Sequence, residues 1–435
     1  MQATRKRRIG VGIAGLALVL AACGSDKKES DTSTAATTTA AAGATTTAAA
    51  SATTTAATGA TTTAAGGSGA TTTAASGSGE QIAAIPTGVK CSNITIAYLG
   101  ALSGDNGNLG KNMINGAQIA FDEFNKANPD CQVKFDTSYD SQGDPTQATP
   151  LADTIVGKTD VIGLIGPGFS GETKATMPKF EAGGLPIISP SATNAALSTN
   201  GWKMFHRVLA NDDKQAPGVA NLIKNVVKGT KIGVIDDASE YGKGLADSVR
   251  KELGALDVKD AQIDPKAADY SAAVTAMTSA DVDTVFYGGY YNEAAKLVTQ
   301  LRDAGFKGNF VSGDGSLDIG FAENAGDAGN GAFLTATGAP PDVNPEFAAA
   351  YKAKFSADPG LYSPESYDCA RIFLAGIAEG KVTRADMATF VSAYDAQGIT
   401  KHIKFDATGE PIGDAVFYTI VEDGKLVSKG LIPSS

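Results

Sequence analysis

The sequence predicts an α/β fold with two lobes, each a doubly wound parallel sheet covered by helices on both faces. Strand-like apolar runs alternate with amphipathic helical stretches over residues 91–435, and this alternation is typical of parallel sheets. It comes in two series, followed by a stretch rich in helix. At 435 residues the chain also exceeds what one hydrophobic core usually organises.

The first series opens the folded body. We expect strands at 94–99, 133–140, 161–165 and 185–189, with helices at 110–126, 145–156 and 171–182 between them. In the second series we expect strands at 231–236, 282–287 and 310–312, with helices at 241–253 and 292–303. The stretch after Asn344, with a helix at 367–378, can return to the first sheet. The chain should therefore cross between the lobes several times.

The N-terminus has the pattern of an export signal. Residues 5–8 are basic, residues 9–20 are apolar, and Ala21 and Ala22 are small. This apolar run is too short for a permanent transmembrane helix. Leu20-Ala21-Ala22-Cys23 is similar to the lipobox of bacterial lipoproteins, which predicts a signal peptide over 1–22 and a lipid on Cys23. The alternative is an ordinary signal peptide with an incidental cysteine.

A low-complexity segment follows. Residues 31–79 contain 18 Thr, 18 Ala, 7 Gly and 5 Ser, with Asp31 as the only other residue type, and this composition cannot form a core. We therefore assign residues 23–90 to the lipidated cysteine and a disordered tether, whose ends would lie roughly 45 Å apart. O-glycosylation of its threonines stays open.

The net charge limits the classes of binding partner, and the cysteines bear on the redox state of the compartment. Without residues 1–22 the chain has 32 basic and 47 acidic residues, a net charge of −15, so we expect no nucleic-acid partner. Cys91 and Cys131 each precede a predicted strand, and neighbouring parallel strands would bring them together. After export we expect a disulfide there, with two free thiols as the alternative. Cys369 falls in a predicted apolar helix, where a packed core residue is the simplest interpretation.

Polar residues follow the predicted strands, where ligands of parallel sheets bind. In the first series these are hydroxyls and glycines, including Ser170, Ser191 and Thr193; in the second they include Asp314. Hydroxyls and backbone N–H groups at a helix start suit a carboxylate, whereas a carboxylate and backbone carbonyls suit an ammonium group. Together the two sets suit a zwitterion.

Sequence motifs typical of enzymes and of cofactor-binding proteins are either absent or lie in the wrong context. Residues 166–171 spell Gly-x-Gly-x-x-Gly, but after the third strand and without an acid for the ribose at the end of the next. Only His206 and His402 are available as histidines, and neither lies near a strand-end hydroxyl in the sequence. Metal-ligand spacing and a phosphate-binding loop are also absent from the sequence. We expect no enzyme activity, no cofactor and no metal.

Five segments carry a resemblance to a known family. They are Gly100-Ala101-Leu102-Ser103-Gly104, Val161-Ile162-Gly163, Ser189-Pro190-Ser191-Ala192-Thr193, Glu240-Tyr241-Gly242-Lys243-Gly244 and Tyr287-Gly288-Gly289-Tyr290. With them, residues 93–425 resemble the Leu/Ile/Val-binding family of solute-binding proteins of ABC transporters, which have the type I periplasmic-binding-protein fold. The resemblance implies two lobes joined by three crossing segments, near 207–210, 335–338 and 401–406. It divides the body into an N-terminal lobe of 91–207 and 335–400 and a C-terminal lobe of 208–334 and 401–435.

The resemblance also implies the roles of individual residues. Ser170 and Thr193 would hold a ligand carboxylate, and the Ser191 carbonyl, the Thr193 hydroxyl and Asp314 would hold its ammonium. The side-chain pocket would be lined by Leu109, Gly168, Phe169, Ala192, Tyr241, Tyr290 and Tyr362. For each tyrosine, ordinary packing is the alternative.

Departures from the family pattern leave the ligand open. Asp314 and Phe169 stand where the best-known members have Glu and Cys, and Leu109 and Tyr362 replace larger or less polar aromatics. A cysteine pair of some relatives is replaced by Gly143 and Phe169. An amide, urea or aromatic acid stays an alternative to an amino acid, branched-chain or other, and a sensor or a wall protein stays an alternative to a transporter subunit.

Taken together, the sequence predicts an extracytoplasmic lipoprotein. We expect a monomer, anchored to the outer face of the cell membrane through Cys23. It would bind a small molecule, which the family resemblance implies to be an α-amino acid, and deliver it to the membrane subunits of an ABC permease.

Overall fold

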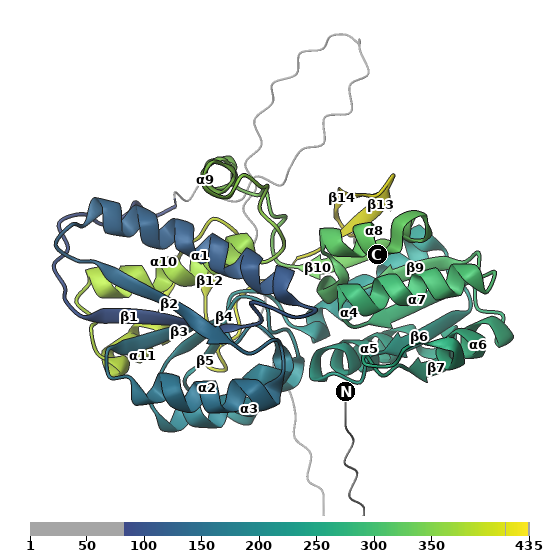
Figure 1. Ribbon diagram of the computed structural model, residues 1–435, viewed down its shortest axis with the longest axis horizontal. Helices are drawn as coiled ribbons and strands as arrows, with labels where there is room; N and C mark the ends of the chain where they lie inside the picture. The colour runs from purple at the N-terminus through teal and green to yellow at the C-terminus, as the bar shows by residue number, and fades with distance from the viewer. Residues whose placement is uncertain (1–81, 414, 434–435) are drawn as a thin grey trace, which may run out of the picture. The chain divides into compact units, whose positions relative to one another are not determined.

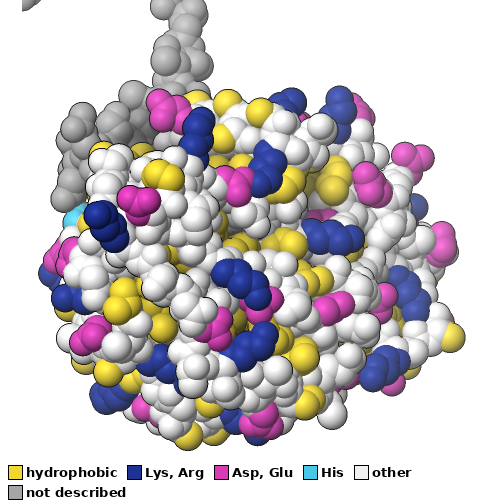
Figure 2. All heavy atoms as spheres, turned by 60° about the vertical axis from the view of Figure 1, so that its left-hand side comes forward, with side chains coloured by type: hydrophobic (Ala, Val, Ile, Leu, Met, Phe, Trp, Pro, Cys, Tyr) yellow, Lys and Arg dark blue, Asp and Glu magenta, His cyan; other side chains and the backbone are white. Residues whose placement is uncertain are grey.

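The computed structural model describes residues 82–413 and 415–433 (Figure 1). The predictions for the signal peptide, for Cys23 and for nearly all of the linker lie outside these residues. Within them, no helix is both long and apolar enough to cross a membrane. Basic and acidic side chains are interspersed over the face shown in Figure 2 rather than gathered by sign.

The first lobe contains a five-stranded, wholly parallel sheet of order β2-β1-β3-β4-β5. Its strands are β1 (Ile94–Gly100), β2 (Val133–Asp140), β3 (Val161–Ile165), β4 (Ile187–Ser189) and β5 (Phe205–Arg207). The central strand β1 is buried along its whole length. Its alternate side chains enter two separate hydrophobic clusters, one on each face of the sheet. A strand buried on both faces reads as a continuous apolar run, which is why the sequence revealed it.

Helices cover both faces of this sheet. They are α1 (Gly107–Ala127), α2 (Pro145–Gly157), α3 (Ser170–Ala182), α9 (Pro345–Phe355), α10 (Ser363–Ala378) and α11 (Arg384–Ser392). Helix α1 packs along α10 and α2 packs along α3, as Figure 1 shows. Helix α10 begins four residues before the expected start, with Pro364 in its first turn, where proline fits a helix. A small antiparallel sheet follows, of β11 (Asp395–Gln397) and β12 (His402–Lys404).

The second lobe contains a seven-stranded sheet of order β14-β13-β10-β9-β8-β6-β7. Its strands are β6 (Ile232–Asp236), β7 (Asp257–Gln262), β8 (Thr284–Gly288), β9 (Asn309–Ser312), β10 (Phe333–Thr337), β13 (Val416–Glu422) and β14 (Lys425–Leu431). Its helices are α4 (Asp212–Asn221), α5 (Glu240–Leu253), α6 (Ser271–Ser279), α7 (Tyr291–Asp303) and α8 (Ile319–Ala325). Short helical turns lie at Ala195–Asn200, Leu222–Val227, Gly254–Leu256, Asp314–Ser316 and Gly326–Gly329.

The second sheet differs from the expected parallel sheet at one edge only. Strand β13 pairs antiparallel with both β10 and β14. Asp423 and Gly424 form the two-residue turn between β13 and β14, with φ of 50° and 71°. Positive φ at both positions matches the twist of a tight hairpin, and an Asp-Gly pair favours it. That dipeptide was the sequence signal for the hairpin.

The chain passes between the two sheets three times. It leaves the first sheet after β5 and enters α4, which packs on α5 and β10. It leaves the second sheet after β10 and enters α9, which packs on α1. It returns after β12, through residues 405–415, to pair β13 with β10.

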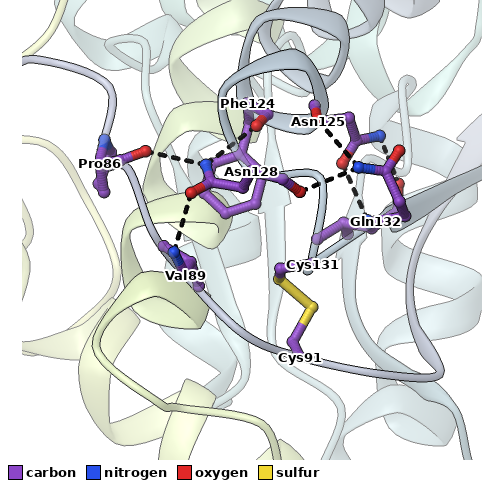
Figure 3. Close-up of a disulfide and its surroundings, with 9 residues drawn as sticks. Pro86, Val89, Cys91, Phe124, Asn125, Asn128, Cys131 and Gln132 are labelled. Carbon is purple, nitrogen blue, oxygen red and sulfur yellow. Dashed lines mark hydrogen bonds between the residues drawn. A yellow bond between two sulfur atoms is a disulfide. The ribbon is translucent and has the colours of Figure 1, made fainter.

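The predicted disulfide between Cys91 and Cys131 is present, with a Cα–Cα distance of 4.4 Å (Figure 3). Beside it the Asn128 side chain accepts a hydrogen bond from Val89 N–H and donates to the Pro86 carbonyl, at 3.0 and 2.8 Å. The segment before β1 is thus fixed to the C-terminal end of α1. The prediction of a disordered tether that extends to residue 90 is therefore wrong for its last residues, because these hydrogen bonds hold them against the first lobe. Cys369 is a free thiol buried in α10, as its sequence context indicated.

We predict that a variant with Cys91→Ser and Cys131→Ser loses about 4 kcal/mol of unfolding free energy, because the bridge closes a loop of 40 residues. Urea unfolding followed by fluorescence measures this. A reducing agent should lower the midpoint of the unsubstituted protein and leave that of the variant unchanged. Equal midpoints for the two oxidised proteins would contradict the prediction.

Candidate functional site

A small cavity lies between the two lobes, at the carboxyl ends of their strands. Its volume is about 10 Å³, room for about one water molecule. It is lined by Leu109, Gly168, Phe169, Ser170, Ser191, Tyr241, Tyr290, Asp314, Gly315 and Tyr362. All of these except Gly315 belong to the predicted site. Ala192 and Thr193, also predicted, do not line the cavity, although both are buried directly after Ser191.

The first lobe contributes two interlocked turns, one after β3 and one after β4. Ser170 is the first residue of α3, so its backbone N–H has no partner within the helix. Its hydroxyl accepts the backbone N–H of Asn194 at 3.2 Å. The Ser191 hydroxyl donates to the Gly168 carbonyl at 2.6 Å. These bonds hold the two turns at a fixed separation, and they present hydroxyls and N–H groups on one side of the cavity.

A buried arginine supports the second of these turns from behind. Arg207 is fully buried, and its Nη1 donates to the carbonyls of Ala192 and Asn194 at 2.7 and 3.0 Å. Its Nε and Nη2 donate to the carboxylate of Glu410, which lies in the third crossing. The guanidinium therefore joins the turn that carries Thr193 to a segment connecting the lobes.

The second lobe contributes Asp314, which follows β9 after Gly313 and is 1% exposed. Tyr241 donates its hydroxyl to Asp314 Oδ1 at 2.8 Å, and Tyr362 donates its hydroxyl to Oδ2. Burial raises the pKa of Asp314 above its ordinary value, while the two tyrosine hydrogen bonds oppose that rise. Tyr362 lies on the first-lobe side, so its hydroxyl reaches across the cavity to the other lobe.

Aromatic rings form the wall between the two sides. Phe169 meets Tyr290 edge to face at a centroid distance of 5.4 Å, and Tyr241 lies 5.2 Å from Tyr290. At the rim, Lys174 pairs with the Glu240 carboxylate at 2.9 Å, and Asn194 Nδ2 donates to the Glu240 carbonyl at 2.6 Å. The lobes thus meet directly, and a molecule of amino-acid size needs them to separate before it can enter.

The described residues contain no group of three or more His, Cys, Asp or Glu arranged to hold a metal ion. The site is instead a set of hydroxyls and backbone donors facing a buried carboxylate across aromatic rings. Such an arrangement can donate hydrogen bonds to a polar group on one side and accept them on the other. Comparison with known proteins gives the same picture: a family model described as periplasmic binding protein matches residues 93–425.

The chain belongs to the periplasmic binding protein family. It is 28% identical to the Leu/Ile/Val-binding protein of Citrobacter freundii over 327 residues, which cover 73% of this chain and 88% of that protein. The leucine binding protein LivK of Thermotoga maritima matches with 25% identity and a TM-score of 0.72, covering 78% of this chain and 98% of the other. LivJ of Streptococcus pneumoniae, a branched-chain amino acid transporter substrate binding protein solved with isoleucine, matches with 26% identity, a TM-score of 0.71 and coverage of 78% and 99%.

These matches confirm the family resemblance and the two-lobed fold class inferred from the sequence, apart from the antiparallel edge. Sequence reasoning missed Gly315 in the cavity wall, and Asp212 and Gln215 on the first turn of α4. A side chain at 315 would collide with Tyr241, at 2.6 Å from its ring. The two α4 residues were not singled out because a polar first turn of a helix usually faces solvent.

This periplasmic binding protein also buries an acid next to the turn that begins α3. Glu172 is fully buried; its Oε1 accepts the Ser141 hydroxyl, and its Oε2 has no partner among the described residues. Burial raises the pKa of Glu172 from 4.5 to about 7. The side chain is therefore largely protonated at pH 6 in the folded protein, whereas it is ionised in the unfolded chain.

We predict that Glu172 lowers the stability of the protein as the pH rises from about 4.5 to 7, by at most about 3 kcal/mol. In that interval the folded state holds a proton that the unfolded state has released, so raising the pH favours unfolding. Glu172→Gln should remove this part of the pH dependence, whereas Glu252→Gln, at an exposed position of α5, should keep it. Urea unfolding of the three proteins at pH 5 and pH 8 tests this, and equal pH dependence for the unsubstituted protein and Glu172→Gln would contradict it.

Proposed function

We propose that this protein is an extracytoplasmic solute-binding subunit of an ABC importer and that its ligand is an α-amino acid. The observation that carries the proposal is the buried Asp314 carboxylate, which faces hydroxyls and free backbone N–H groups across a cavity between two lobes. The family membership and the binding of leucine or isoleucine named for its relatives support it. The activity is binding and delivery, not catalysis.

The proposed contacts divide between the two lobes. The N-terminal lobe (91–207 and 335–400) would hold the ligand carboxylate through Ser170 and Thr193. The C-terminal lobe (208–334 and 401–435) would hold the ammonium through Asp314, assisted by the Ser191 carbonyl and the Thr193 hydroxyl of the other lobe. The ligand side chain would lie against Leu109, Phe169, Ala192, Tyr241, Tyr290 and Tyr362.

Tyrosine hydroxyls now occupy the Asp314 oxygens, and an ammonium group would take their place. An N–H donor of a charged ammonium makes a stronger hydrogen bond to a carboxylate than a neutral hydroxyl does. Ligand entry would open the lobes about the three crossings and break the bond between Tyr362 and Asp314. Closure on the ligand would then restore the direct contacts at the rim, and the closed form would be the one that docks on the permease.

We predict that the refolded, ligand-free domain of residues 80–435 is stabilised by one or more of the twenty L-amino acids in a thermal-shift screen. At a hundredfold excess over the dissociation constant, a ligand adds about 2.7 kcal/mol. Asp314→Asn should weaken that binding by more than tenfold, because it removes the charge opposite a buried ammonium, whereas Asp327→Asn, at an exposed position, should not. Unchanged affinity of Asp314→Asn in calorimetry would refute the role of Asp314.

One observation favours a second candidate, a neutral amide or a carboxylic acid without an amine. Burial raises the pKa of Asp314, and a protonated carboxyl donates one hydrogen bond and accepts another, which suits an amide. Stabilisation by acetamide, urea or benzoate, and by none of the amino acids, would select this candidate and retain the importer.

The anchoring of the protein is a further part of the proposal. Cys23 would carry a lipid that holds the mature chain at the outer face of the cell membrane, as a monomer on a tether that ends before Ala83, since Ala83, Pro86 and Val89 are held by the first lobe. We predict that Cys23→Ser moves the protein from the membrane fraction to the soluble extracytoplasmic fraction. Cys369→Ala should leave its distribution unchanged. An unaltered membrane fraction for Cys23→Ser would contradict the lipid anchor.

A further inference from the structure

A group of buried oxygen atoms without partners lies just behind the candidate site. Asp212, Gln215 and Thr193 are at most 1% exposed. Both carboxylate oxygens of Asp212, Oε1 of Gln215 and the hydroxyl of Thr193 have no hydrogen-bonding partner among the described residues. A buried polar atom without a partner has lost its hydrogen bonds to water and gained none in return, which is unfavourable. Several unpartnered buried oxygen atoms in one cluster therefore call for a structural or functional explanation.

Asp212 lies where the two lobes meet. It is the first residue of α4, and its backbone N–H donates to the Thr193 carbonyl at 2.9 Å. A Cβ atom added to Gly244 of α5 would lie 3.6 Å from Asp212 Oδ2 and 2.4 Å from Asn194 Nδ2. The carboxylate is therefore enclosed between the Thr193–Asn194 turn of one lobe and α5 of the other.

Gln215 connects this group to Asp314. It lies three residues after Asp212 on α4, and its Nε2 donates to the Thr335 hydroxyl at 3.1 Å. The Gln215 side chain also hydrogen-bonds Asp314, and this bond opposes the rise of the Asp314 pKa that burial causes. The unpartnered acceptors and the proposed ammonium site thus belong to one continuous polar cluster.

The charges around Asp212 favour a cation. Burial raises its pKa well above the ordinary value, and the negative charges of Asp314 and Asp213 raise it further. Thr193 and Arg207 lower the pKa of Asp212. The Arg207 guanidinium, however, is already bound to Glu410. Tyr241 of α5 directs its hydroxyl to Asp314. The carboxyl groups of Asp212 and Asp314 thus lie close enough together for the charge of one to raise the pKa of the other.

We propose that Asp212 is a positioning residue for the ammonium group of the ligand and acts through Thr193. Its carboxylate accepts a hydrogen bond from the Thr193 hydroxyl, and the hydroxyl oxygen accepts an N–H from the ammonium. A hydroxyl has one proton to donate and two lone pairs, so a hydrogen bond donated to Asp212 leaves the Thr193 oxygen free to act only as an acceptor toward the ligand. This inference rests on the proposed function, and it restricts the ligand to molecules that carry an amine.

The test compares ligands that differ only in the amine. Calorimetry is done with L-leucine, L-isoleucine, L-valine and L-alanine, and with the α-hydroxy acid that corresponds to each. Asp212→Asn should weaken binding of the amino acid at least tenfold and change binding of the hydroxy acid less than twofold. Asp213→Asn is the matched control: Asp213 is the next residue of α4, exposed, and accepts a hydrogen bond from Ser248 at 3.0 Å. It should bind like the unsubstituted protein.

A double substitution tests the route through Thr193. With Thr193→Val in place, Asp212→Asn should cause less than a twofold further loss of amino-acid affinity, because the hydroxyl that it orients is gone. Circular dichroism and thermal unfolding establish that each variant is folded. If Asp212→Asn does not fold, Asp212→Ser replaces it in both experiments.

The outcomes separate this inference from the function beneath it. Amino-acid binding that is unchanged in Asp212→Asn overturns the inference and leaves the proposed function in place. Equal losses for the amino acid and its hydroxy acid also overturn it, because they indicate a purely structural role. If the unsubstituted protein binds hydroxy acids or amides but none of the amino acids, both the proposed function and the inference are overturned.

Discussion

The buried guanidinium of Arg207 is the constraint on which the site depends. It satisfies two carbonyls of the turn that carries Thr193 and pairs with Glu410 in a crossing segment. Removing one partner of a buried ion pair costs about 3 to 5 kcal/mol, because the other charge is left unpaired. The ion pair therefore ties the shape of the first-lobe turn to the path of the chain between the lobes. A movement of the crossing segment would therefore also displace the turn that carries Thr193.

Most of the first sheet could be predicted from the sequence, because its central strands are buried on both faces. Strand β3 is an unbroken apolar run, and α2 and α3 follow their strands at nearly the expected residues. The hairpin of β13 and β14 was harder to predict. In β13 buried residues alternate with half-buried ones, and β14 has no buried residue at all, so neither strand has the continuous apolar run of the central strands. The Asp423-Gly424 pair is typical of a tight hairpin turn. It does not indicate that β13 pairs with β10, which lies far earlier in the chain.

The sequence predicted which residues form the candidate site, but not how their side chains contact one another. Ser170, Ser191 and Asp314 follow strands, and the position of strand ends is readable from sequence. That Tyr241 and Tyr362 would both donate to Asp314 depends on how the lobes meet. Tyr362 also adopts a left-handed backbone conformation, with φ of 67°, which is uncommon for a bulky residue. Asp212 escaped notice for the same reason, since its burial arises only when α5 packs over the first turn of α4.

The segment before β1 determines where a mechanical load would enter this protein. Asn128 holds it through Pro86 and Val89, Arg371 of α10 donates to the Ala83 carbonyl at 2.6 Å, and the disulfide follows at Cys91. All three attachments lead into α1, α10 and the first sheet. A pull on the proposed tether would thus be transmitted to one lobe alone. With the proposed anchor, tension would reorient the whole protein at the membrane and would leave the proposed opening and closing of its lobes unstrained.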